Sequence, residues 1–520
     1  MSAAGPEAPD AAEADEGWRR LDGRAPLVAG AVMTSVAAGV CPPVALLLLD
    51  TRWVGGPATT LALLLTGAVL LILGGAAAEA LRLRRTRYRA GPGVVELHSG
   101  ILLVNRRSLA RERIRTVDLS AHPLLRLLGL VKVRIGTGER AGSGTPTLEL
   151  NPVSRAEGER LRRELLGRGG AAVPGADHEG PLAALDPRWI RYAPLSFVAP
   201  TLGFAAAGAV MQVSDWFGQQ GEVIERVGDL FRGTSVLTMV LVLLLAALLA
   251  GVVGSLGLWV EMWWHHRLER EPGGTLRVRR GLFTTRSISL EENRLRGVEL
   301  VEPLGVRLAG AARVDAVAVG VGGGSDDETA DLHVLLPAAP RAVAEAVAAR
   351  VLREPAAPTA LPLTAHPRAA RDRRLRWALS AVLVPLAALA ALGLWLTPVL
   401  LWTAGALALV ALPLAVLLAL DAYRSLGHGA DGAFLLVRSG TFRRSTVVLR
   451  RDGVIGWVIR QSVFQRRAGV LTLTATTAAG AGGYAVRDAD AGEGLAFAAD
   501  AVPGLLAPFL EPPPRPAPRA

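Results

Sequence analysis

The segment Ser108–Gly138, SLARERIRTVDLSAHPLLRLLGLVKVRIGTG, holds the pattern that decides the fold. A charged turn leads into an Ile-x-x-Val pair, Ile114 and Val117, and a Leu-Leu-Gly sequence then ends at Gly129. An alternating apolar run follows, formed by Val131, Val133 and Ile135. Alternation with a period of two predicts a strand with one buried face. The segment therefore predicts a β-rich unit with a tight turn at Gly129.

The same pattern occurs three times along the chain. Each copy has two glycines 29 residues apart, and the pairs are Gly100 and Gly129, Gly281 and Gly310, and Gly440 and Gly469. A leucine follows the first glycine of each pair by nine residues, at Leu109, Leu290 and Leu449. A fixed spacing shared by three copies indicates an internal repeat. We expect the glycines to occupy backbone positions that disfavour a side chain, such as turns with positive φ.

Each copy closes with a glycine-rich turn, one more strand and a helix. In the first copy, Ser154 and Glu157 form a capping box ahead of Leu161 and Leu165. In the second copy, three valines spaced by four residues share one helix face, at Val343, Val347 and Val351. Each unit is thus predicted to contain several short strands followed by one amphipathic helix.

Hydrophobic composition places the chain in a membrane. Of its 520 residues, 51% are hydrophobic and 20% are charged, and the mean hydropathy is +0.35. A helix needs about 20 apolar residues to cross a bilayer core of about 30 Å. Six segments qualify: Pro26–Leu49, Pro57–Ala78, Ala193–Met211, Thr234–Val260, Trp377–Leu396 and Val399–Leu420. They form three closely spaced pairs, and each pair predicts a transmembrane hairpin ahead of one repeat unit.

Arginine placement predicts the orientation, because cytoplasmic flanks carry the excess of basic residues. The loops inside the three hairpins hold only Arg52, Arg226 and Arg232. Basic clusters instead follow the second helix and precede the fifth, and they include Arg82, Arg84, Arg85, Arg87, Arg371, Arg373, Arg374 and Arg376. We therefore expect a multi-pass protein of the cell membrane with both termini and all repeat units in the cytoplasm.

These eight arginines are also candidates for contact with anionic lipids, since juxtamembrane basic residues gain about 1 kcal/mol each from anionic headgroups. Two other roles remain open for them, which are enforcement of topology alone and contact with a protein. The net charge of +11 does not predict a nucleic-acid partner, because no basic surface interleaved with aromatic residues is present.

Motifs for catalysis, cofactors or metals are not found. Cys41 is a single cysteine in an apolar run, and Gly320–Ser325 lacks the spacing of a phosphate loop. Ser255 lies in a predicted helix without a histidine to act as its base, and His265 with His266 has no nearby ligand partner. We therefore predict no catalytic residues, no cofactor and no metal.

The repeat unit resembles the pleckstrin-homology (PH) fold, a bent β-barrel closed by a C-terminal helix. The segment Ser108–Gly138 is most similar to the membrane-bound bacterial PH domains of the YdbS/YdbT-like family, in which such domains follow paired transmembrane helices. The third copy departs from the pattern, because Trp457 replaces the valine and Arg467-Ala468-Gly469 replaces Leu-Leu-Gly.

The predicted fold class is an α+β membrane protein with six transmembrane helices in three hairpins, each followed by a cytoplasmic PH-like domain, a β-barrel or sandwich plus a C-terminal helix. The hairpins are expected at 26–80, 189–260 and 376–420, and the PH-like domains at 81–170, 261–355 and 421–511. Linkers are expected at 171–188 and 356–375, a disordered tail at 1–25 and a Pro-rich tail at 512–520.

These features predict a non-enzymatic membrane scaffold whose PH-like domains mediate protein or membrane-surface interactions. The resemblance implies a role in envelope stress or antimicrobial-peptide tolerance. The expected partners are the bilayer and either a companion membrane PH-domain protein or a second copy of the chain. The alternative is a component of a lipid- or peptide-handling transporter, which the lack of charges inside the predicted spans disfavours.

Overall fold

The computed structural model describes residues 17–50, 57–100, 104–114, 116–136, 147–166, 180–196, 198–272, 274–319 and 333–509. The chain divides into two compact units, Met1–Glu291 and Glu292–Ala520. The division falls inside the second repeat predicted from the sequence. The fold is α+β, with long apolar helices and several antiparallel sheets in both units.

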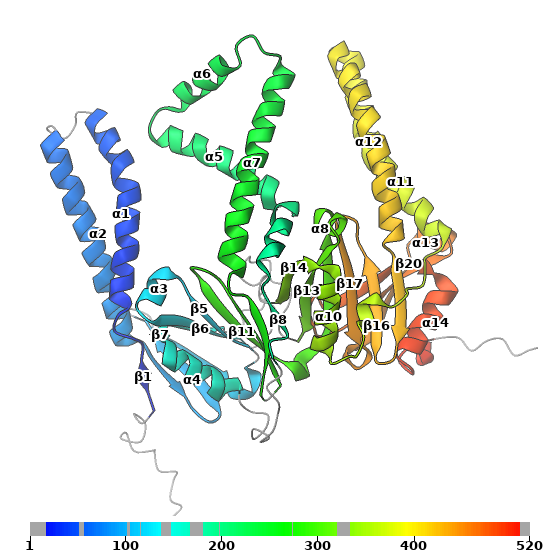
Figure 1. The fold of residues 1–520 in the computed structure, drawn as a ribbon, viewed down its shortest axis with the longest axis horizontal. Coiled ribbons are helices and arrows are strands. Elements are labelled where there is room, and N and C mark those ends of the chain that lie inside the picture. Colours follow the sequence, from blue (N-terminus) through cyan, green and yellow to red (C-terminus); the bar gives the residue numbers. More distant parts are fainter. Residues whose placement is uncertain are drawn as a thin grey trace, which may run out of the picture. The chain divides into compact units, whose positions relative to one another are not determined.

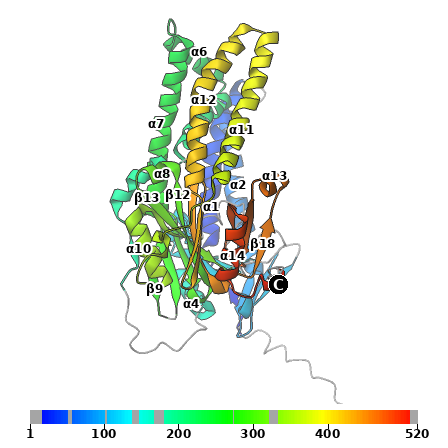
Figure 2. The ribbon, with the colours of Figure 1, turned by 90° about the vertical axis from the view of Figure 1, so that its right-hand side faces the viewer.

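Five helices are long and apolar enough to cross a membrane. In the first unit they are α1 (Ala25–Asp50), α2 (Pro57–Arg85) and α7 (Val236–Trp263), and in the second unit they are α11 (Arg368–Trp395) and α12 (Pro398–Arg424). The helices α1 and α2 pack against each other (Figure 1), and so do α11 and α12 (Figure 2). The structure therefore confirms five of the six apolar helices that the sequence predicts.

The sixth helix, expected over Ala193–Met211, is not one straight span. Its first residues belong to the 3-10 helix η2 (Pro187–Leu195), which contains Pro194, and the helix α5 (Val198–Trp216) follows at an angle of 69°. Proline cannot donate the helical hydrogen bond and so favours a break. Only η2 and α5 together reach the length and hydropathy of a span. The expected loop after this helix contains a further helix, α6 (Gln220–Leu230).

Two sheets occupy the first unit. A four-stranded sheet has the order β1 (Arg19–Arg20), β2 (Arg87–Ala90), β3 (Val94–Ser99) and β4 (Asn105–Ala110). A seven-stranded sheet has the order β7 (Leu148–Ser154), β6 (Leu130–Gly136), β5 (Thr116–Ala121), β11 (Thr285–Glu291), β10 (Thr275–Arg280), β9 (Arg267–Glu271) and β8 (Ala183–Ala184). The short helix α3 (Pro123–Leu127) joins β5 to β6.

The core of the first repeat lies between these two sheets and one helix. Val95 from β3, Val133 from β6 and Leu161 from the helix α4 (Arg155–Leu166) are all buried in a single apolar cluster. Burial of such side chains contributes about 1.5–3 kcal/mol each. The helix approaches β6 closely because Gly158 leaves room for Val131. Strands and closing helix thus form one packed unit, as the alternating pattern predicts.

The second unit has the same kinds of elements. A six-stranded sheet has the order β14 (Val334–Pro340), β13 (Ala311–Ala318), β12 (Leu295–Pro303), β17 (Arg443–Arg450), β16 (Phe434–Ser439) and β15 (Gly427–Asp431). A three-stranded sheet has the order β18 (Gly456–Arg460), β19 (Val470–Thr476) and β20 (Gly483–Asp490). The helices are α8 (Leu304–Leu308), α10 (Arg341–Leu352), α13 (Val463–Arg467) and α14 (Ala491–Ala501).

Consecutive repeats are joined by strand pairing. The strand β5 of the first repeat pairs with β11 of the second, and β12 of the second repeat pairs with β17 of the third. Both junctions have one register: Ser120 lies opposite Arg286, and Val301 lies opposite Ser445. In each case the residue nine before the second glycine faces the residue five after the first glycine of the next repeat. The sequence did not predict this pairing.

The expected tail and linkers contain secondary structure. Residues Arg19–Arg20, assigned to the disordered tail at 1–25, form β1 and pair with β2, and Leu21 is buried behind them. In the linker 171–188, β8 pairs with β9 and Leu182 is buried. In the linker 356–375, a 3-10 helix forms at Pro358–Ala360 and α11 begins at Arg368. Burial of a few apolar side chains fixes these short pieces, which lack a periodic signal. Residues 1–16, 171–179 and 512–520 lie outside the described residues.

All six repeat glycines have positive φ. The values are 138°, 111° and 110° at the first glycines, Gly100, Gly281 and Gly440, and 69°, 68° and 66° at the second glycines, Gly129, Gly310 and Gly469. The two classes differ in their surroundings. A Cβ at Gly440 would lie 2.1 Å from the Arg443 carbonyl oxygen, whereas a Cβ at Gly469 would meet nothing within 4 Å.

We expect Gly440→Ala to destabilise the third repeat more than Gly469→Ala. The left-handed conformation at Gly469 costs an alanine about 1–2 kcal/mol, and at Gly440 a backbone clash adds to a φ that alanine rarely adopts. Thermal unfolding of the full-length protein in detergent measures the difference. Asparagine should be tolerated at Gly469 and not at Gly440, since asparagine enters the left-handed region most readily. Equal losses at the two positions would contradict the distinction.

Candidate anion-binding site

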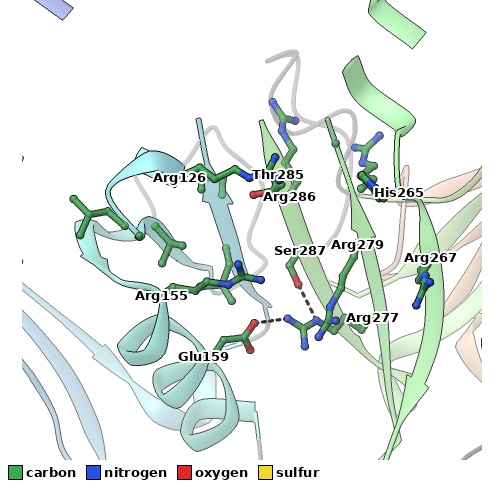
Figure 3. A pocket seen from close by; sticks show the side chains of 18 residues that line it. Arg126, Arg155, Glu159, His265, Arg267, Arg277, Arg279, Thr285, Arg286 and Ser287 are labelled. Carbon is green, nitrogen blue, oxygen red and sulfur yellow. Dashed lines mark hydrogen bonds and ion pairs between the residues drawn. The ribbon is translucent and has the colours of Figure 1, made fainter. Parts of the chain in front are cut away.

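A cavity of about 440 Å³ lies at the junction of the first and second repeats, within the first unit. Its walls come from β5, β6 and the start of α4 on one side, and from β9, β10 and β11 on the other (Figure 3). All three residue pairs of the β5–β11 ladder line it. We call it the basic pocket because seven arginines and one glutamate line it: Arg126, Arg155, Arg267, Arg277, Arg279, Arg280, Arg286 and Glu159.

Strand register places two of these arginines directly opposite each other. Arg279 on β10 lies across from Arg267 on β9 and, on its other side, across from Ser287 on β11. Like charges directly opposite each other on neighbouring strands destabilise a sheet. Both side chains are exposed, as is Arg155 at the start of α4. Within the part of the chain that the structure describes, these three arginines have no carboxylate within ion-pair distance.

The floor of the basic pocket is neutralised. Arg277 is only 3% exposed and donates to Glu159 at 2.6 Å, Glu271 at 3.0 Å and the Ser287 hydroxyl at 2.8 Å. The buried Arg162 contacts the same two carboxylates. Burial alone would raise the pKa of Glu159, but hydrogen bonds and charge from Arg277 and Arg162 outweigh it and the pKa is lowered. The floor therefore consists of two acids with lowered pKa values, paired with two arginines.

The rim keeps its positive charge without such partners. Burial lowers the pKa of Arg279, and the neighbouring charge of Arg277 lowers it further. The charges of Glu269, Glu159 and Glu271 act in the opposite direction and offset this lowering only in part. Strand register places Arg267 and Arg279 side by side at this rim.

The basic pocket lies next to the end of a membrane-length helix. The Glu261 carboxylate near the end of α7 accepts hydrogen bonds from the backbone N–H groups of Phe283 and Thr284, at 3.0 and 2.8 Å. Arg280 stacks on the Trp263 ring, with its guanidinium carbon 4.3 Å from the ring centroid. The turn between β10 and β11 is thereby fixed to α7, and His265, just beyond the helix, lines the pocket.

The predicted lipid-contact arginines lie elsewhere, and none of them lines the basic pocket. Arg82 bonds to Glu79 and to the Asn151 carbonyl, and Arg373 and Arg374 both contact Asp488. Two more contact Asp372 in the same helix, Arg371 through its carboxylate and Arg376 through its carbonyl. Arg87 lies in β2. Arg84 and Arg85 are exposed at the end of α2, with no ion pair to any described residue.

The sequence contains one signal for the basic pocket, which is the spacing of two arginines along a strand. Arg277 and Arg279 alternate along a strand, so both point to one face of the sheet. The missing information was the identity of the neighbouring strand, since Arg155 and Glu159 come from the previous repeat. Among the described residues, no group of three or more histidine, cysteine or acidic side chains could hold a metal ion.

The family model for the bacterial PH domain matches two segments of the chain, residues 35–169 and 378–499. The match supports a bacterial PH-domain protein. Each bacterial PH-domain segment begins inside an apolar helix, α1 or α11, and extends to the closing helix of its repeat, α4 or α14. The basic pocket combines residues of the first segment, such as Arg155, with residues outside both segments, such as Arg279. Neither a curated protein nor a solved structure matches the chain significantly.

We expect Arg279→Gln to stabilise the ligand-free protein. The substitution removes one of two like charges that face each other across β9 and β10, and such pairs cost a few tenths of a kcal/mol to about 1 kcal/mol. Thermal unfolding in detergent at low salt should show a higher Tm, and the gain should shrink as salt screens the repulsion. Arg277→Gln is the matched control, and it should lower the Tm because it leaves Glu159 and Glu271 short of a partner. If Arg279→Gln lowers the Tm instead, then Arg279 stabilises the fold.

Proposed function

We propose that the protein is a non-enzymatic integral membrane scaffold whose PH-like domains mediate interactions at the cytoplasmic membrane surface. The two bacterial PH-domain segments and the five membrane-length helices support this proposal. The resemblance to the YdbS/YdbT-like family extends it to envelope stress or antimicrobial-peptide tolerance. The proposal also includes a PH-like domain in the second repeat, which neither matched segment covers.

The observation that carries the membrane-surface role is the opposed pair Arg267 and Arg279 in the basic pocket. Exposed like charges in register weaken the sheet, and a bound anion would remove that cost. Guanidinium groups offer paired N–H donors that match the oxygens of phosphate, and such charge-assisted bonds are about twice as strong as neutral ones. We therefore propose that the pocket binds a phosphate-bearing anion.

A membrane lipid is the nearest source of such an anion. His265, which follows α7, and Arg280 of β10, which stacks on Trp263 of α7, both line the pocket, so the pocket lies where the helix meets the sheet. Tryptophans cluster at membrane interfaces, and Trp259, Trp263 and Trp264 occupy this end of α7. An anionic phospholipid headgroup could thus reach Arg279 while its chains remain in the bilayer.

The binding test compares two double variants that each remove two positive charges. In Arg267→Gln/Arg279→Gln the charges come from the basic pocket, and in Arg84→Gln/Arg85→Gln they come from the exposed end of α2. The full-length protein in neutral detergent is titrated with dioctanoyl phosphatidylglycerol, and thermal stabilisation is recorded. We expect the pocket variant to weaken apparent affinity by about tenfold per arginine, since hydrogen bonds to charged groups contribute about 1.5–3 kcal/mol each.

The control variant should bind as the unchanged protein does, and dioctanoyl phosphatidylcholine should stabilise neither. Equal weakening by both double variants would show unspecific surface adhesion and would overturn the pocket as a binding site. Inorganic pyrophosphate supplies the second arm. Binding of pyrophosphate with no response to phosphatidylglycerol would assign the pocket to a soluble phosphate compound.

The orientation has its own test. Alkaline phosphatase, which is active only outside the cytoplasm, should be active when inserted within α6 and inactive when inserted at Gly480, in the turn between β19 and β20. The reason is the arginine bias of the helix flanks. Activity at Gly480 would place the sheets outside the cell and remove the cytoplasmic role.

A further inference from the structure

Among the described residues, the strand pairing between repeats leaves one equivalent strand at a sheet edge in the first repeat and one in the third. In the first repeat, β4 occupies the repeat position of β11 and β17, and it is the edge of its four-stranded sheet. In the third repeat, β18 occupies the position of β5 and β12, and it is the edge of its three-stranded sheet. Edge strands present unpaired N–H and C=O groups to any chain that can pair with them.

The register of the two existing junctions specifies how these edges would meet. In both, the residue five after the first glycine faces the residue nine before the second glycine. Applied to the free edges, this rule places Asn105 opposite Arg460. It also places Arg107 opposite Val458, and Leu109 opposite Gly456.

Gly456 supplies an independent observation. Its equivalent in β12 is Gly297, which faces Leu449 of the incoming strand β17. A Cβ at Gly297 would lie 2.0 Å from the Val448 carbonyl oxygen, so the incoming strand requires glycine there. A Cβ at Gly456 would meet only the Thr476 hydroxyl, at 3.2 Å. Within the described chain the added Cβ has one tight contact, to a side chain, whereas an incoming strand would bring its backbone against it.

The first junction shows what happens without that glycine. Thr116 stands at the equivalent position of β5, and the β5–β11 ladder covers only three residue pairs, ending at Leu119 and Ser287. The β12–β17 ladder, with Gly297, covers seven pairs. The edge strand β18 therefore has glycine at the same repeat position as β12, which forms the longer junction.

Both edges are open in the described structure. Five of the six residues of β4 are exposed, and so are Val458 (39%) and Ile459 (43%) on β18. Exposed apolar residues on an edge strand favour pairing with another strand, because natural edges are usually protected by charge or by a covering element.

We propose that β18 of one copy pairs antiparallel with β4 of a second copy, in the register of the internal junctions. The inference deepens the proposed scaffold function, because it names a second copy of the chain as partner. The contact joins different surfaces of the two copies, so it generates a closed ring or an open row in the membrane. Each repeat along the chain brings one pair of apolar helices with it. A second copy paired in the same way would add its helix pairs next to those of the first.

Cysteine crosslinking in native membranes tests the register. Two differently tagged chains, both with Cys41→Ser, are co-expressed, one with Arg107→Cys and the other with Val458→Cys. A short thiol-specific crosslinker should join them, because directly opposite residues have Cβ atoms about 4.5–5.5 Å apart. Pairing Arg107→Cys with Ile459→Cys is the control, since a shift of one residue moves a side chain to the other face of a sheet. We expect at least a fivefold lower yield there.

Two further variants test the contact itself. Adding Gly456→Ala to the Val458→Cys chain should abolish the crosslink while leaving its Tm within a few degrees, because the one close contact of the Cβ within its own chain is with the Thr476 hydroxyl, at 3.2 Å. Ile459→Lys, an exposed change that leaves the core intact, should do the same. Equal yields in the matched and shifted pairs would overturn the proposal, and so would a crosslink yield that Gly456→Ala does not change. Native mass spectrometry that shows only the monomer would overturn it as well.

The outcomes separate this inference from the lipid role. Arg267→Gln/Arg279→Gln should leave the crosslink unchanged, and Gly456→Ala should leave stabilisation by phosphatidylglycerol unchanged. Loss of the crosslink in the pocket variant would show that assembly depends on the bound anion, and would overturn pairing by strand register alone.

Discussion

Main-chain pairing between consecutive repeats is the interaction on which the rest of the structure depends. Because β5 pairs with β11 and β12 pairs with β17, the second half of each repeat shares a sheet with the first half of the next. The two halves of the second repeat consequently belong to different sheets, and the division into compact units falls between them, after Glu291. The repeat seen in the sequence is therefore not the unit of strand pairing.

The two junctions share a register and differ in chemistry. At the second junction Arg444 faces the buried Glu302 and bonds to it at 2.7 Å, and Arg443 contacts Glu299. At the first junction the pair equivalent to Arg444 and Glu302 is Thr285 and Ala121. Small uncharged side chains stand there in place of the ion pair, and Arg267 and Arg279 line the pocket without a described ion-pair partner. One register thus produces an ion-paired contact in one place and a basic pocket in the other.

Local pattern was enough to predict the strands around each second glycine, the closing helices and five apolar helices. Val131, Val133 and Ile135 are buried as their alternation implies, and the glycine φ values agree with turns. The sequence did not predict pairing between repeats, because periodicity reports which face of a strand is buried and not which strand lies beside it. It also missed the break after Leu195, since the apolar run continues through it, and β1, which is two residues long.

The lipid-contact arginines stay a prediction, and they were chosen from sequence clusters without long-range information. Arg373 and Arg374 follow the juxtamembrane pattern, yet the strand β20, which brings Asp488 to them, lies more than a hundred residues away. Arg267 and Arg279 have no cluster in the sequence and become neighbours only through strand register. Charge clusters along a chain therefore do not report which arginines strand pairing brings together.

Repeat arrays gain stability from contacts between neighbours, and their ends normally carry protective features. Here the two ends differ in character. The edge β4 carries Arg106 and Arg107, whereas β18 carries Val458 and Ile459. Antiparallel pairing of β4 with a second β4 would bring arginines opposite or close to one another, which disfavours it. Pairing of β4 with β18 lets the long arginine stems cover the apolar side chains of Val458 and Ile459 while their charged ends stay in water. The asymmetry of the edges thus favours a head-to-tail contact over pairing of two β4 edges.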